Sequence, residues 1–279
     1  MILENSIKQA KAILKKNDIV SYELDAEILL SNILGVSKEF LLLNSNIDIS
    51  NEIQKKYYEA INRRAKKEPV AYIIGKKEFW SQDFIVNKAT LIPRPETELL
   101  IYYVVDFFKD KKINILDIGT GTGCILLSIL KELVYSKGIG IDVSAKAIKI
   151  ANLNANKFNL SNRSKFKIFN INKFNFGKYD LIVSNPPYIK SRDIKNLSED
   201  IANYEPAIAL NGGLNGLDLI KKIIYKSNIL LKKNGLFAIE IGNRQYKEVS
   251  DLLRKFKFRE MTRVYDYGYN VRCIISTKV

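Results

Sequence analysis

The sequence predicts an α/β protein in which a doubly wound sheet domain follows a small helical bundle and a β-hairpin linker. Apolar residues recur at helical spacing in residues 2–68, short β-rich pieces follow in residues 69–90, and strand and helix signals alternate from Ile113 onward. We therefore divide the chain into a helical domain (1–68), a linker (69–90) and a sheet domain (91–279).

The helical domain is predicted from one-face spacing next to residues that start or end helices. Ser50 is a residue type that caps helices, and a second periodic segment runs from Asp25 towards Gly35. The apolar positions behind Ser50 are Ile53, Tyr57, Tyr58 and Ile61. A small bundle of helices follows from this pattern.

The linker contains two β-rich pieces, Val70–Ile74 and residues 84–86, on either side of Gly75 and a charged stretch. This pattern predicts a β-hairpin. Phe79 and Trp80 lie between the two pieces. We expect these aromatic side chains to pack between the two domains, in preference to contacting a substrate.

The sheet domain is predicted from alternating strand and helix signals, which are typical of a doubly wound α/β fold. The expected strands are residues 113–116, 139–141, 165–168, 181–184 and 236–241, and the expected helices are residues 123–135, 144–156 and 217–231. Residues 262–267 and 270–276, around Gly268, predict a closing antiparallel hairpin.

Composition excludes several classes of protein and of site. The chain has 279 residues, is 47% hydrophobic and contains no run of about 18 apolar residues. Its amino terminus lacks a basic region followed by an apolar one, so we expect a soluble cytoplasmic protein. The absence of histidine removes Ser-His and Cys-His nucleophiles and most zinc sites. Cys124 and Cys273 have no paired spacing, so no metal site is expected.

The formal net charge of +15 is compatible with a nucleic-acid partner. However, residues 1–68 carry 11 basic and 10 acidic side chains, and the abundance of Lys, Ile and Asn indicates a compositional bias of the whole chain. The charge is therefore weak support for a nucleic-acid substrate.

A glycine-rich turn links the first expected strand to its helix in the segment Leu-Asp-Ile-Gly-Thr-Gly-Thr-Gly-Cys, residues 116–124. Glycines let the backbone approach a ligand closely and aim helix-start amides at it. The spacing Gly-Xaa-Gly-Xaa-Gly differs from the dinucleotide pattern, and the Asp117 carboxylate would repel a pyrophosphate but attract an ammonium group. The loop therefore favours S-adenosylmethionine over a nucleotide.

Two further places are expected to contact such a cofactor. Asp142 ends the next expected strand, 23 positions after Gly119, close to the roughly 20 that separate the glycines from a ribose-binding carboxylate. The alternative for Asp142 is a helix cap before Ser144. After the third strand, Asn172 and Lys173 occupy the place where adenine would be read, with ordinary loop residues as an equal alternative.

The quartet Asn185-Pro-Pro-Tyr188 follows the strand-like residues 180–184. It places a side-chain amide and several backbone carbonyls at the carboxyl end of a central strand, where open α/β sheets bind ligands. Pro186 and Pro187 donate no backbone hydrogen bond, so the carbonyls of this stiff segment remain available as acceptors. The pattern suits a planar NH2 group, and a strand ended by a Pro-Pro turn is the alternative.

With the glycine loop, the acidic strand end and Asn-Pro-Pro-Tyr in this order, the chain resembles class I S-adenosylmethionine-dependent methyltransferases that modify exocyclic or amide nitrogen. That group includes DNA adenine methyltransferases. The closer resemblance is to the peptide chain release factor N5-glutamine methyltransferases, and it extends over nearly the whole length. Four segments carry it: residues 68–75 with Phe79, residues 91–98, residues 204–206 with 209–210, and residues 266–268 with Asn270 and Arg272.

The resemblance implies a helical substrate-binding domain, a hairpin linker and a Rossmann-like catalytic domain. It implies the cofactor S-adenosyl-L-methionine, released as S-adenosyl-L-homocysteine, and as substrate the glutamine of the Gly-Gly-Gln motif in bacterial class I peptide chain release factors. The implied cofactor ligands are Gly119, Thr120, Gly121, Thr122, Gly123, Asp142 and Asn185. The implied glutamine-binding residues are Asn185, Pro186, Pro187 and Tyr188. Lys173 departs from the family, which often places an aromatic residue there.

The catalytic residues in this interpretation are Asn185, Pro186 and Tyr188. The Asn185 side-chain oxygen and the Pro186 carbonyl would accept hydrogen bonds from the glutamine amide, and Tyr188 would pack over the amide plane. We expect a monomer that needs no stable nucleic-acid partner and no membrane. Two alternatives use the same fold: an N6-adenine methyltransferase that grips a flipped base in DNA or RNA, and a catalytically silent nucleic-acid-binding protein.

Overall fold

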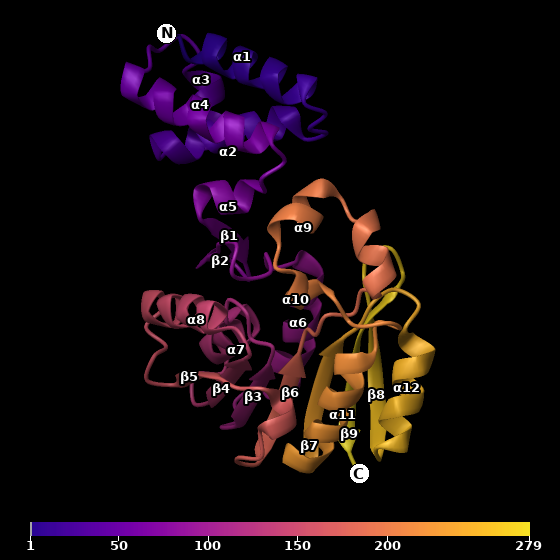
Figure 1. Ribbon diagram of the computed structural model, residues 1–279. Coiled ribbons are helices and arrows are strands. Elements are labelled where there is room, and N and C mark those ends of the chain that lie inside the picture. Colours follow the sequence, from indigo (N-terminus) through magenta and orange to yellow (C-terminus); the bar gives the residue numbers. More distant parts are fainter. Residues whose placement is uncertain (1) are drawn as a thin grey trace. The chain divides into compact units, whose positions relative to one another are not determined.

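The computed structural model describes residues 2–279, which form two compact units (Figure 1). The first unit contains the residues up to Lys76 together with Ser198–Tyr204, and the second contains Lys77–Leu197 and Glu205–Val279. A short segment from late in the sequence thus belongs with the amino-terminal helices, where the Tyr204 hydroxyl donates to the Lys66 carbonyl at 2.6 Å.

The first unit is a bundle of helices, as the sequence predicted. Its helices are α1 (Leu3–Lys16), α2 (Tyr22–Leu34), α3 (Lys38–Leu43), α4 (Asn51–Ala65), α5 (Val70–Ile74) and α9 (Glu199–Tyr204). Buried side chains such as Leu14 and Tyr57 form its core. The Ser50 hydroxyl accepts a hydrogen bond from the Ile53 amide at 3.3 Å, which confirms the expected cap of α4. Gly35 ends α2 in the left-handed conformation, also as expected.

The segment Val70–Ile74 is the helix α5 and not a strand, so the prediction for these residues is wrong. Pro69 precedes the helix, and Gly75 ends it at a φ of 77°. Three of its side chains pack against the core of the bundle: Val70, Ile73 and Ile74. Burial on one helical face therefore outweighs the preference of Val and Ile for strands. The hairpin follows directly, as β1 (Lys76–Phe79) and β2 (Gln82–Ile85).

The second unit is the predicted α/β domain, built on a seven-stranded sheet. The five strands in the order β5-β4-β3-β6-β7 are parallel, β9 pairs with β7 in antiparallel orientation, and β8 pairs with β9. The strands are β3 (Asn114–Ile118), β4 (Lys137–Asp142), β5 (Ser164–Ile168), β6 (Tyr179–Ser184), β7 (Leu231–Glu240), β8 (Phe258–Tyr265) and β9 (Val271–Lys278). The helices are α6 (Glu98–Phe107), α7 (Cys124–Glu132), α8 (Ala145–Lys157), α10 (Ala207–Leu210), α11 (Asp218–Leu230) and α12 (Tyr246–Lys255), with 3-10 turns η1 (Pro95–Thr97), η2 (Ile171–Lys173) and η3 (Ser191–Asn196). The expected closing hairpin is confirmed by β8 and β9.

Phe79 packs inside the second unit, which corrects the expectation that it would pack between two domains. It is 1% exposed, and its ring meets that of Phe84 edge-on with the centroids 5.9 Å apart. Both rings belong to the core that α6 and α7 cover. Trp80 packs against the same core, and its indole N–H donates to Glu132 at 2.8 Å. The aromatic residues therefore anchor the hairpin to the sheet domain.

Alternate residues of the central strands face opposite sides of the sheet and form two cores. Ile115 and Val183 belong to the core beneath α6 and α7, whereas Leu116 and Ile182 belong to the core beneath α11 and α12. Figure 1 shows α11 and α12 beside β7, β8 and β9. Among residues 2–279, no helix is both long and apolar enough to cross a membrane.

Phe84→Ala should destabilise the second unit by about 3–5 kcal/mol, because it removes a fully buried ring and leaves a cavity. Chemical denaturation followed through the fluorescence of Trp80, the single tryptophan, measures this loss next to the altered core. Tyr267→Ala is the matched control, because Tyr267 is 96% exposed and its loss should change stability by about 0.5 kcal/mol or less. Equal midpoints for the two variants would contradict the assignment of this core.

Candidate active site

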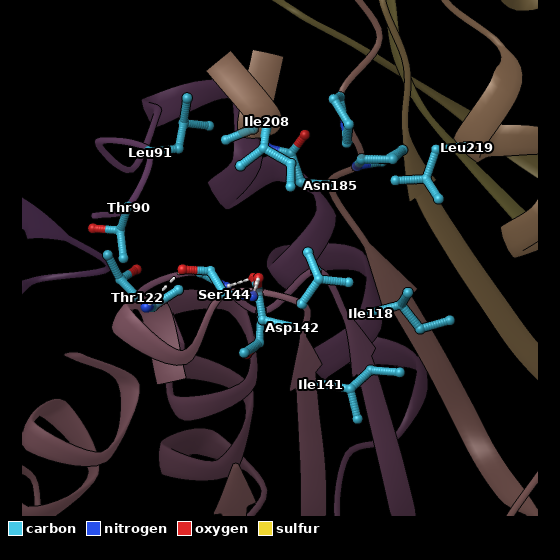
Figure 2. Close-up of a pocket in the computed structure, with 18 of the residues that line it drawn as sticks. Thr90, Leu91, Ile118, Thr122, Ile141, Asp142, Ser144, Asn185, Ile208 and Leu219 are labelled. Carbon is cyan, nitrogen blue, oxygen red and sulfur yellow. Dashed lines mark hydrogen bonds between the residues drawn. The ribbon is translucent and has the colours of Figure 1, made fainter. Parts of the chain in front are cut away.

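A cavity of about 310 Å³ lies at the carboxyl ends of β3, β4 and β6 (Figure 2). The turns after these strands line it, together with residues 89–94 and the start of α11. β3 and β6 are neighbours in the sheet, and the Ser184 hydroxyl donates to the Ile118 carbonyl at 2.7 Å where the two strands end. This is the point at which the strand order reverses, where open α/β sheets bind their ligands.

The turn after β3 presents backbone to the cavity. Gly119 and Gly121 have φ values of 77° and 54°, and no heavy atom of residues 2–279 other than those of the glycine and its two chain neighbours lies within 4 Å of the position that a Cβ would take. Backbone conformation, and not crowding, therefore favours glycine at both positions. Thr120 and Thr122 line the cavity with them. Gly123 lies outside the lining and precedes the first residue of α7 at a φ of 79°.

Asp117 lies beneath this turn and reaches the cavity only through a neighbour. Its Oδ2 accepts a hydrogen bond from the Thr120 hydroxyl at 2.7 Å, whereas its buried Oδ1 has no hydrogen-bond partner among residues 2–279. Burial raises the pKa of Asp117 to about 7, against the opposing effect of the Thr120 hydrogen bond. When it is ionised, the Asp117 carboxylate places a negative charge behind the glycine turn.

Asp142 borders the cavity at the end of β4. Its Oδ2 accepts from the Gly121 amide at 3.1 Å, and its Oδ1 accepts from the Ser144 amide at 2.9 Å. Burial raises the pKa of Asp142, while these backbone hydrogen bonds lower it. The capping position of α8 belongs to Ser144, whose hydroxyl accepts from the Ala147 amide at 3.2 Å. Asp142 therefore ties the turn after β4 to the glycine turn.

The loop after β5 contributes one side of the lining. Asn172 lies on this side, and Phe169 adds an aromatic ring that packs edge-on against Phe174 with the centroids 5.3 Å apart. Lys173 is exposed and lies outside the lining. The aromatic residue of this wall is thus Phe169, four positions before Lys173.

The four residues after β6, 185–188, do not all face the cavity. Asn185, Pro186 and Pro187 line the cavity, and Tyr188 lies outside the lining. In the view of Figure 2, Asn185 and Asp142 border the same space. The Tyr188 hydroxyl lies 3.4 Å from Glu240 Oε1, and burial, with the nearby Glu240 carboxylate, raises the pKa of Tyr188.

Two residues that the sequence reasoning missed hold the Asn185 side chain. Asn185 Nδ2 donates to Thr97 Oγ1 at 3.1 Å, and the Thr97 hydroxyl donates to Glu240 Oε2 at 2.6 Å. Burial raises the pKa of Glu240 to about 7. The sequence held two signals for them: Thr97 lies in the segment 91–98 that carries the family resemblance, and Glu240 lies near the carboxyl end of a predicted strand.

A further pair, from two of the segments that carry the family resemblance, holds the cavity wall. Glu205 is buried and accepts from the Arg94 guanidinium at 2.5 Å and from the Ile92 amide at 3.2 Å. It thereby joins the segment before α6 to the segment before α10, and residues of both segments line the cavity.

Comparison with known proteins first defines the class. A family model described as a methyltransferase domain matches residues 109–267. A solved methyltransferase from Pyrococcus furiosus shares the fold at a TM-score of 0.54 and 16% identity, over 82% of this chain and 99% of that chain. The second unit therefore has the fold of the class I methyltransferases.

Sequence relatives then define the family. A model described as the PrmC N-terminal domain matches residues 5–75. The release factor glutamine methyltransferase of Clostridium acetobutylicum is 36% identical over 100% of this chain and 99% of its own length. That of Buchnera aphidicola subsp. Schizaphis graminum is 40% identical over 96% of this chain and 97% of its own length. The chain belongs to the release factor glutamine methyltransferases, which confirms the family resemblance found in the sequence.

Proposed function

We infer that the protein transfers a methyl group from S-adenosylmethionine to the side-chain amide nitrogen of a glutamine in a peptide chain release factor. One observation carries this conclusion: Asn185, Pro186 and Pro187 line the same cavity as the glycine turn and Asp142. Residues 185–187, which can hold a planar amide, thus border the cavity that can hold the methyl donor. Membership of the family supports the assignment of the glutamine.

The site suits S-adenosylmethionine at three points, two in the lining and one buried behind it. The backbone at Gly119 and Gly121 is open to close approach. Each Asp142 oxygen accepts one backbone N–H and keeps a further lone pair for a ribose hydroxyl. The unpaired, buried oxygen of Asp117 favours a cationic group such as the methionine ammonium. Asn172 and Phe169 are available for the adenine, and we assign no contact to Lys173. When bound, the cofactor supplies an electrophilic methyl group.

The residues after β6 position the substrate amide. An amide nitrogen is a weak nucleophile, because its lone pair is delocalised, so alignment must supply much of the catalysis. The Asn185 side-chain oxygen and the Pro186 carbonyl each accept one N–H of the glutamine amide and thereby aim its nitrogen. Alignment of reacting groups can lower a barrier by up to roughly 7–11 kcal/mol.

The same two acceptors stabilise charge that develops on the substrate. The glutamine nitrogen becomes positive as the methyl group leaves the sulfonium for it, and it returns to a neutral amide when one N–H proton is lost to water. Fixed carbonyl dipoles therefore interact with the nitrogen more strongly in the transition state than in the ground state. One such oriented group contributes roughly 3 kcal/mol. Tyr188, expected from the sequence to pack over the amide plane, lies outside the lining, and its hydroxyl contacts Glu240.

The partner belongs to the same proposal. The substrate glutamine is that of the Gly-Gly-Gln motif in bacterial class I release factors, and the enzyme acts as a monomer in the cytoplasm. A nucleic-acid N6-adenine methyltransferase would place an adenine NH2 group against the same acceptors.

Incubation with methyl-labelled S-adenosylmethionine separates these substrates. Parallel reactions contain a bacterial class I release factor, adenine-containing DNA, or adenine-containing RNA. We expect label in the release factor, and peptide mapping by mass spectrometry should place it on the glutamine of Gly-Gly-Gln. Label in nucleic acid but not in protein would overturn the proposed function.

Asn185→Ala should lower methyl transfer by about 10²-fold or more, because it removes one oriented acceptor. The affinity for S-adenosylmethionine, measured by calorimetry, should stay within a few-fold. Asn162→Ala, in an exposed turn, removes the same side chain at a distance from the cavity and should behave as wild type. Retained turnover in Asn185→Ala would remove Asn185 from the mechanism.

Asp142→Ala should weaken binding of S-adenosylmethionine by about 10- to 100-fold, since hydrogen bonds to a charged group contribute roughly 1.5–3 kcal/mol. Calorimetry gives the dissociation constant, and circular dichroism checks the fold. Asp106→Ala on α6 is the control, because Asp106 is exposed. An unchanged dissociation constant in Asp142→Ala would exclude Asp142 from the ribose site.

A further inference from the structure

The side-chain amide of asparagine has two ends of nearly the same shape and opposite hydrogen-bonding character. Its oxygen accepts hydrogen bonds and its NH2 group donates them. Only the oxygen end of Asn185 is useful for holding a substrate NH2 group. A rotation of the amide by 180° would present donors to donors. Some feature of the structure must therefore select the orientation.

The hydrogen bonds from Asn185 to Thr97 and from Thr97 to Glu240 select the orientation of the amide. An ionised Glu240 can only accept, so the Thr97 hydroxyl must use its single proton in the 2.6 Å bond to Glu240 Oε2. Thr97 Oγ1 can then only accept from Asn185, which requires the NH2 group at the 3.1 Å contact. The Asn185 oxygen is left for the cavity.

We propose that Thr97 and Glu240 are positioning residues whose hydrogen bonds orient the Asn185 amide with its oxygen towards the substrate. This role rests on the proposed function, and it explains why Asn185 presents an acceptor to the substrate. Neither residue needs to touch the substrate amide itself. Thr97 borders the cavity beside Asn185, Glu240 lies outside the lining, and both act through Asn185.

Burial makes this selection effective. Thr97 is 2% exposed and Glu240 is 1% exposed, so solvent offers little substitute for either partner. In a site of low dielectric, hydrogen bonds to a charged group are strengthened, and an unpaired polar group is costly. A side chain at position 97 without a hydroxyl would leave the Asn185 NH2 group without its acceptor and the amide free to turn.

The groups around Glu240 determine when it is ionised. Burial, together with the Glu96 carboxylate, raises the pKa of Glu240 to about 7, whereas the hydrogen bonds from Thr97 and Tyr188 and the Arg272 guanidinium favour the charged form. Tyr188 and the thiols of Cys124 and Cys273 also lie within electrostatic reach of Glu240, and burial raises the pKa of each of these three groups, which keeps them neutral near pH 7. Glu240 is therefore the group of this set that changes charge near neutrality.

Protonation of Glu240 reverses the direction of the hydrogen bonds between Glu240, Thr97 and Asn185. A protonated carboxyl can donate to Thr97, whose own proton is then free to point at Asn185 and favours the oxygen end of the amide there. The NH2 group then faces the cavity. The turnover number kcat should consequently be highest above pH 7 and fall as the pH decreases through about 7.

We call the chain of hydrogen bonds from Asn185 through Thr97 to Glu240 the relay. Thr97→Val tests it with a side chain of nearly the same shape as threonine. It should lower kcat by about tenfold, the effect of one hydrogen bond, with an unchanged dissociation constant for S-adenosylmethionine. Thr97→Ser, which keeps the hydroxyl, should restore most of the activity. Thr262→Val on β8 makes the same chemical change away from the cavity and should have no effect. Wild-type kcat in Thr97→Val, or equal losses in Thr97→Val and Thr97→Ser, would overturn the relay.

The pH profile gives a readout that a merely structural role would not change. Glu240→Gln should lower kcat by about tenfold at pH 8 and remove the inflection near pH 7, because the titrating group is gone. Asp117 has a pKa in the same range, but it acts on the glycine turn, so kcat is measured at saturating S-adenosylmethionine. Glu248→Gln, on the exposed face of α12, is the control and should keep the wild-type profile.

The outcomes separate the relay from the proposed function. A wild-type enzyme that labels no release factor overturns the proposed function and the relay together. Labelling by the wild type with an unchanged pH profile in Glu240→Gln overturns the relay alone. Should Thr97→Val fail to fold by circular dichroism, Glu240→Gln carries the test.

Discussion

The candidate active site depends on two parallel strands, β3 and β6, that are neighbours in the sheet although they are far apart in the sequence. Ile118 pairs with Ser184 at their carboxyl ends, and the Ser184 hydroxyl donates to the Ile118 carbonyl. From these two strands the chain proceeds towards opposite edges of the sheet. The turns that follow them, which hold Gly119 and Asn185, therefore emerge side by side and border one cavity.

The pairing of β3 with β6 brings Asn185 to the cavity, and the buried Glu240 carboxylate determines which end of the Asn185 amide faces it. Glu240 near the end of β7 accepts from Thr97, and Thr97 accepts from Asn185. Three segments of the chain, η1 and the ends of β6 and β7, thus converge on one amide. The Thr97 hydroxyl has only one proton and donates it to the Glu240 carboxylate, so it can only accept from Asn185. The charge of Glu240 therefore turns the oxygen of Asn185 towards the cavity without contacting the substrate.

Much of this architecture could be predicted from sequence because its signals are local. Strand and helix periodicities located the sheet domain, and the positions of Asp142 and Asn185 at strand ends placed both at the cavity. Tertiary packing overruled local preference at Val70–Ile74, where β-branched residues form a helix against the bundle core. The partnership of Thr97 with Glu240 joins residues 143 positions apart, so no spacing rule could reveal it. The loop of Lys173 shows the same limit, since only the folded chain shows which aromatic ring lines the wall.

Neutron diffraction from crystals grown above pH 8 in deuterated solution would locate the exchangeable hydrogens around Asn185. If Thr97 and Glu240 orient the amide, the Asn185 atom that faces Thr97 carries two deuterium atoms, and the Thr97 deuterium points at Glu240 Oε2. The cavity side of Asn185 is then a bare oxygen. Two deuterium atoms on the cavity side of that amide would show that Thr97 and Glu240 do not orient it.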